Sequence, residues 1–111
     1  MIEKLINYFV QIYYAENVDC KKEDEGGFYF TVSRKEKPTS TSKVLKKINY
    51  EGEDEEGLYF MVLEEGKKEA EFRVLKRINL TNGNNVERRE IGEKDWNLTG
   101  IFNLRKSGIF V

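Results

Sequence analysis

The chain contains an internal repeat, EDEGGFYFTVSRKEKPTSTSKVLKKINY at residues 23–50 followed by EDEEGLYFMVLEEGKKEAEFRVLKRINL at residues 53–80. The two copies align at a constant offset of 30 residues without a gap, and 13 of the 28 aligned positions are identical. A solenoid needs at least about three repeats to bury a continuous core. Two copies therefore predict two equivalent pieces of one sheet.

Each copy opens with a segment typical of a β-strand. Residues 28–32 (FYFTV) and 58–62 (LYFMV) alternate between two sets of side chains and are rich in aromatic and β-branched residues. In the second half, residues 43–48 (KVLKKI) fit a helix, or a strand in which Lys46 is the polar member of an apolar face. Residues 38–42 (PTSTS) are poor helix formers, and residues 64–68 (EEGKK) are typical of a hairpin turn. We therefore predict a β-hairpin in each copy; the alternative is a duplicated β-α unit.

The segments on either side of the repeat extend this picture. The apolar residues near the N-terminus recur at helical spacing and predict an amphipathic helix that ends near residues 17–20 and packs on the sheet. These residues are Ile2, Leu5, Ile6, Phe9, Ile12 and Tyr13. Beyond the repeat, Asn82-Gly83 is a hairpin signal, and Val86–Ile91 is expected to be a charged edge strand. In the C-terminal segment we expect core positions at Ile101, Phe102 and Leu104, and docking of Ile109–Val111.

Together these patterns predict an α+β fold, with an N-terminal amphipathic helix packed on an antiparallel β-meander that contains the duplicated hairpin. The 111 residues fit one domain, 1–111, with the internal repeat 23–50 and 53–80. Of these residues 39% are hydrophobic and 13% aromatic, which argues against disorder. The net charge of −1 gives no global attraction to nucleic acid or to an anionic membrane.

The residue inventory argues against an enzyme. The sequence has no histidine, which removes the commonest general base and the commonest metal ligand. The acidic clusters at residues 23–25 and 51–56 lack the spacing of a calcium loop, and nothing marks a facing pair of carboxylates for a small hydrolase. We therefore expect no catalytic residues, metal, cofactor or small-molecule substrate. The single cysteine, Cys20, fits a reducing compartment, and we expect a cytoplasmic protein without a membrane span.

Two surfaces are candidates for binding a macromolecule. The first is the strand face that bears Tyr29, Tyr59, Met61 and Leu63, which is more apolar than a solvated sheet face. Because Tyr and Met are enriched at interfaces, we expect a protein partner or a homodimer there, as in accessory or mobile-element inhibitor-type proteins. The alternative is a nucleic-acid-binding stripe of duplicated cations. This stripe would consist of Lys43, Lys46, Lys47, Arg73, Lys76 and Arg77.

Overall fold

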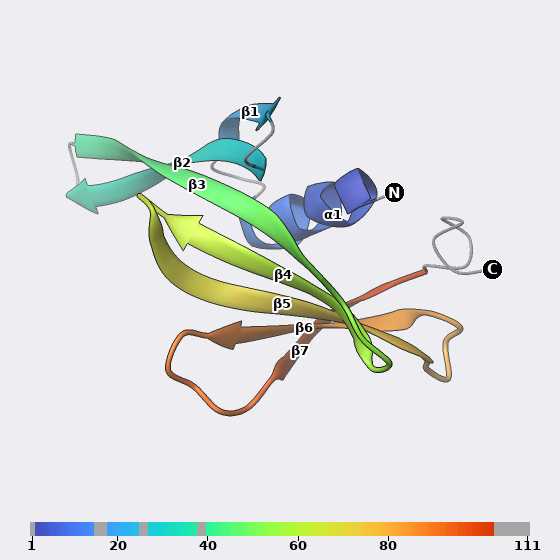
Figure 1. The fold of residues 1–111 in the computed structure, drawn as a ribbon. Helices are drawn as coiled ribbons and strands as arrows, with labels where there is room; N and C mark the ends of the chain where they lie inside the picture. Colours follow the sequence, from blue (N-terminus) through green and yellow to red (C-terminus); the bar gives the residue numbers. More distant parts are fainter. Residues whose placement is uncertain (1, 15–17, 25–26, 38–39, 104–111) are drawn as a thin grey trace.

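The computed structural model describes residues 2–14, 18–24, 27–37 and 40–103, apart from the side chains of residues 19–21, 24 and 35–37. These residues form one helix and seven strands. The elements are α1 (Ile2–Tyr14), β1 (Val18–Asp24), β2 (Gly27–Lys37), β3 (Ser40–Glu53), β4 (Gly57–Glu64), β5 (Lys67–Ile78), β6 (Asn84–Glu90) and β7 (Asn97–Phe102). The strands form a single sheet in chain order from β1 to β7, with every neighbouring pair antiparallel (Figure 1). The α+β class predicted from the sequence is confirmed.

The core lies between α1 and one face of the twisted sheet, here called the inner face. Successive side chains of a strand point to opposite faces, and away from the bulges the buried inward side chains, such as Phe30, Ile48 and Phe72, are even-numbered. In the middle of the core, the ring of Phe9 stacks on Phe72 at a centroid distance of 4.4 Å and meets the edge of Phe60 at 4.9 Å. The buried core residues are Leu5, Ile6, Phe9, Val10, Tyr14, Phe28, Phe30, Val32, Ile48, Leu58, Phe60, Val62, Phe72, Val74 and Val86.

The helix also contacts the last strand through Tyr8. The Tyr8 hydroxyl donates a hydrogen bond to the carbonyl of Ile101 at 2.9 Å and accepts one from the Ile101 amide at 3.0 Å. A Cβ added to Gly100 would lie 2.4 Å from that hydroxyl, so the glycine allows this close approach. The helix therefore contacts both β7 and, through the Tyr14 ring on Phe30, β2.

The two copies of the repeat differ in strand register. In the first copy Phe28 pairs with Ile48. The residues 30 positions later are Leu58 and Ile78, but Leu58 pairs with Val74, four residues earlier. Because four is an even number, the shift moves the hairpin tip without exchanging the faces of the strand.

The structure decides between the two alternatives for the repeat and corrects two expectations about other segments. The second half of each copy is a strand, β3 or β5, which excludes the β-α alternative. Helix α1 is described over Ile2–Tyr14, and residues 18–20, where its end was predicted, belong to strand β1 together with the charged segment that follows. Strand β6 is not an edge, because it pairs with both β5 and β7.

The C-terminal expectations have mixed outcomes. Ile101 is 44% exposed and is not a core residue; its backbone amide and carbonyl hydrogen-bond with the Tyr8 hydroxyl. Phe102 does pack against the core. Leu104 and residues 109–111 lie outside the described residues, as does the side chain of Cys20. Within the described residues, no helix has the length and apolarity that crossing a membrane requires.

Candidate functional site

The outer face of the sheet, opposite α1, has two halves with different surroundings. Over β5 and β6, Arg73 forms an ion pair with Glu87 at 2.7 Å, and Arg89 forms one with Glu71 at 3.1 Å. The ring of Trp96, from the connection between β6 and β7, lies 4.5 Å from the Arg73 guanidinium and 4.4 Å from that of Arg89. This half is therefore closed by the chain itself.

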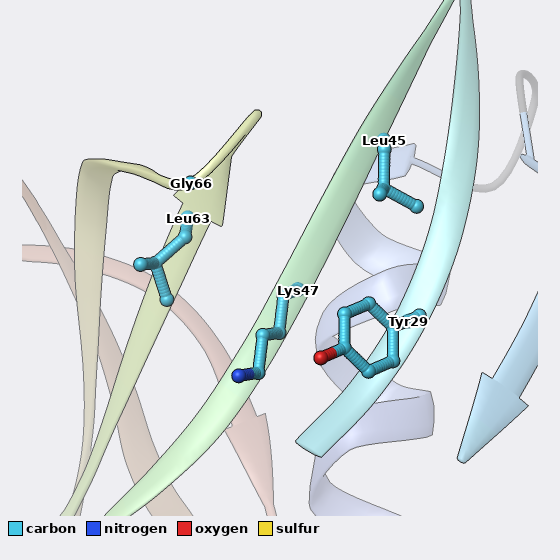
Figure 2. A pocket seen from close by; sticks show the side chains of 5 residues that line it. All are labelled: Tyr29, Leu45, Lys47, Leu63 and Gly66. Atoms are coloured by element: carbon cyan, nitrogen blue, oxygen red, sulfur yellow. The ribbon is translucent and has the colours of Figure 1, made fainter. Parts of the chain in front are cut away.

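The other half, over β2 to β4, contains an open hollow of about 420 Å³. Its lining side chains come from three neighbouring strands and the β4–β5 turn, and they lie on the side of the sheet away from the helix (Figure 2). Leu45 is 43% exposed at the rim of this hollow. We call this surface the β2–β4 face; its hollow is lined by Tyr29, Leu45, Lys47, Leu63 and Gly66.

Of the described residues that line the hollow, Lys47 is the one cation. It pairs across the ladder with Tyr29 on one side and Leu63 on the other. Its ammonium lies 5.3 Å from the centroid of the Tyr29 ring, a distance typical of a cation–π contact. Its stem runs past Gly27, where an added Cβ would lie only 2.8 Å from the Lys47 Cε atom. Among the described residues, no carboxylate forms an ion pair with Lys47.

The four residues predicted as an interface are divided between the two halves. Tyr29 and Leu63 line the hollow. Met61 is half-buried and lies between Tyr59 and Leu63 in β4. Tyr59 donates a hydrogen bond to Asp54 at 3.0 Å, and its ring centroid lies 6.4 Å from that of Trp96. Sequence reasoning did not identify Leu45 or the cover formed by Trp96.

The six predicted cations do not form one stripe. Lys46 points to the inner face, is only 1% exposed, and forms an ion pair with Glu69 at 2.6 Å. Lys76 forms an ion pair with Glu53, and Arg73 with Glu87. The remaining three are Lys43 and Arg77, which are exposed, and Lys47 in the hollow. The stripe fails because adjacent residues such as 46 and 47 point to opposite faces of a strand.

Lys46 belongs to an ionic cluster at the C-terminal end of α1. Its ammonium lies 5.2 Å from the centroid of the Tyr14 ring, and Arg88 donates a hydrogen bond to the Tyr14 hydroxyl at 3.1 Å. Burial alone would lower the pKa of Arg88, but hydrogen bonds with Glu90 and Tyr14 raise it. Burial raises the pKa of Tyr14. Cations at this position also complement the negative end of the helix dipole, so the cluster fixes the end of the helix.

The chemistry within reach of the hollow is that of binding. It offers an ammonium, a phenol and aliphatic surface. Within the described part of the chain, no three or more His, Cys, Asp or Glu side chains are grouped so that they could hold a metal ion. No family model, curated protein or solved structure matches this chain.

Proposed function

We propose that this protein is a non-enzymatic interaction protein that binds another protein through its β2–β4 face. The observation that carries the proposal is the contrast between the two halves of the outer face. Over β5 and β6, Trp96 and two ion pairs close the surface. Over β2 to β4, Leu45 is 43% exposed beside Tyr29 and Leu63. Tyrosine and methionine beside exposed aliphatic side chains are typical of protein interfaces.

The repeat gives this contrast a simple origin. We propose that residues 23–50 and 53–80 arose by duplication of one hairpin, and that the amphipathic helix covers the inner faces of both. The register shift between the copies then allowed the outer faces to diverge. The outer face over β5 became part of a closed surface, and the outer face over β2 and β3 remained available to a partner. A cytoplasmic location belongs to the same proposal and is supported by the single cysteine.

A protein partner is better supported than nucleic acid. Binding to a phosphate backbone requires several cations along one groove. Lys46, Arg73 and Lys76 have carboxylate partners within the chain, and Lys46 is buried. The free energy needed to break those ion pairs would offset the free energy gained from contacts with phosphates.

The test is position-dependent photocrosslinking in the cell that encodes the protein. A photoreactive residue replaces Leu45 in one variant and Glu93, an exposed residue of the β6–β7 connection, in the control. We expect one discrete crosslinked protein from position 45 and none from position 93. A crosslink to a second copy of the chain would assign the face to a homodimer. Equal crosslinking at both positions, or crosslinks to nucleic acid alone, would contradict the proposal.

A further inference from the structure

Each hairpin places a tyrosine directly across the ladder from a cation on the outer face. In the first hairpin Tyr29 pairs with Lys47, and in the second Tyr59 pairs with Arg73. The two pairs are equivalent in space, although the sequence offset of 30 would match Lys47 with Arg77. They provide an internal comparison, because one pair is covered by the protein and the other is open.

The covered pair shows which chemical groups this arrangement accepts. On the far side of Arg73, strand β6 provides Glu87, whose carboxylate accepts hydrogen bonds from Nε at 2.9 Å and from Nη2 at 2.7 Å. The Trp96 ring then lies over the guanidinium at 4.5 Å. A carboxylate and an aromatic ring from outside the hairpin thus complete the tyrosine–cation pair.

In the ranges that the structure describes, neither a carboxylate nor a second aromatic ring completes the open pair in this way. On the far side of Lys47, in the place of Glu87, strand β4 provides Leu63. The hollow of about 420 Å³ lies above, where Trp96 lies in the other half. Gly27 leaves the space through which the Lys47 stem passes, so the ammonium is held beside the Tyr29 ring. Figure 2 shows the Lys47 ammonium and the Tyr29 hydroxyl on the same side of the sheet as the side chains of Leu45 and Leu63.

We propose that the hollow takes a partner segment that presents an Asp or Glu carboxylate to Lys47 and an adjacent aromatic side chain to Leu45 and Leu63. This inference deepens the proposed function and rests on it. The carboxylate of the partner takes the place that Glu87 has beside Arg73, and its aromatic ring takes the place of Trp96. A charge-assisted contact in a partly desolvated hollow is stronger than an exposed surface ion pair, so Lys47 determines which segments bind.

The test is selection from a phage-displayed library of random dodecapeptides against the full chain. We expect enriched peptides with an acidic residue next to an aromatic one. Lys47→Met should weaken the best peptide about tenfold, whereas Lys47→Arg and the control Lys94→Met in the exposed β6–β7 connection should not. Selection against Lys47→Glu should enrich basic peptides instead.

A second pair of variants tests the internal comparison. Leu63→Glu gives Lys47 an intramolecular carboxylate and should abolish peptide binding, while Leu63→Gln, which is uncharged, should weaken it less. Apolar peptides that bind independently of residue 47 would overturn the carboxylate inference and leave the proposed function standing. If Leu45→Asp, folded by circular dichroism, enriched the same peptides as the original chain, the β2–β4 face itself would be excluded and both proposals would fail.

Discussion

At the scale of single residues, Lys46 shows how position in the sheet decides the role of a charge. Lys46 and Lys76 occupy the same position in the two sequence copies, yet Lys46 is 1% exposed and Lys76 is 30% exposed. The register shift places Lys46 where the second hairpin has Phe72, since each lies across from an inward-facing phenylalanine. A buried charge is tolerated only with a partner, and Glu69 provides it. Lys46 is therefore a structural residue.

We expect Lys46→Met to lower the free energy of unfolding by about 1–3 kcal/mol, because it leaves the largely buried Glu69 carboxylate without its closest cation. The matched control is Lys76→Met, whose partner Glu53 is half exposed, and it should cost less than about 1 kcal/mol. Urea denaturation at neutral pH measures both. Equal losses would mean that the burial of Lys46 does not matter.

The candidate site could be predicted only in part. Strand alternation was sufficient to place Tyr29 and Leu63 on one surface, because that pattern is local. The same alternation places Lys46 on the apolar face, which conflicts with the cation stripe, because the stripe groups Lys46 with Lys47 by charge alone. The cover over Arg73 could not be predicted, because Glu87 and Trp96 are distant in sequence and meet it only through the pairing of β5 with β6.

At the scale of elements, the turns explain why two similar sequences pair differently. The β4–β5 turn has two residues, Glu65 and Gly66, with φ of 49° and 82°. Two-residue hairpin turns of type I′ require positive φ at both positions, which glycine adopts at least cost. The first copy has Glu36 where the second has Gly66. A tight turn is disfavoured there, and β2 instead continues to Lys37, which pairs with Ser40.

We expect Gly66→Ala to destabilise the protein by about 1 kcal/mol, because an alanine must adopt a left-handed conformation there. An added Cβ at this position meets nothing within 4 Å, so a steric clash contributes nothing. Lys68→Ala, two residues away and also exposed, is the control and should change little. Thermal unfolding followed by circular dichroism compares the two. A neutral Gly66→Ala would contradict the backbone strain that we assign to an alanine at this positive φ.

The junction between α1 and the sheet should lose stability in alkali. Burial raises the pKa of Tyr14, so the folded state favours the neutral phenol. The contribution of Tyr14 to stability is complete below about pH 10, the ordinary pKa of the phenol in the unfolded chain. It is lost as the pH rises through the higher pKa of the folded state. Tyr14→Phe removes the hydrogen bond from Arg88 and should be less stable at neutral pH. The difference in urea midpoint between Tyr14→Phe and the original chain should then narrow above about pH 10. If the two midpoints fell in parallel as the pH rose, this assignment would be contradicted.

At the scale of the molecule, the class of the fold was easier to predict than the number of its strands and their pairing. The helix and the first strand of each copy follow from periodicity that single segments carry. Strand β1 (Val18–Asp24) does not, since its charged sequence forms a strand only because β2 provides a pairing partner. The internal position of β6 likewise depends on β7, whose pairing joins segments distant from the repeat. Such contacts are properties of the assembled sheet.

The helix contacts strands in both halves of the sheet, so we expect it to make the sheet unfold as one cooperative unit. It contacts β7 through Tyr8 and β2 through Tyr14, and between them Phe9 is fully buried against Phe60 and Phe72. We expect Phe9→Ala to cost about 3–5 kcal/mol, a large share of the roughly 5–15 kcal/mol by which domains are stable. Ile12→Ala, at a 38% exposed position of the same helix, should cost about 1 kcal/mol or less.

The decisive measurement is whether far- and near-ultraviolet circular dichroism report the same unfolding transition in Phe9→Ala. Because rings from α1, β4 and β5 meet at this one position, a loss there should shift both signals together to lower denaturant concentration. If the near-ultraviolet signal were lost first while the strand signal persisted, the sheet would be stable without its helix. The inner face would then be a second exposed apolar surface, and the β2–β4 face would no longer be distinguished by being uncovered.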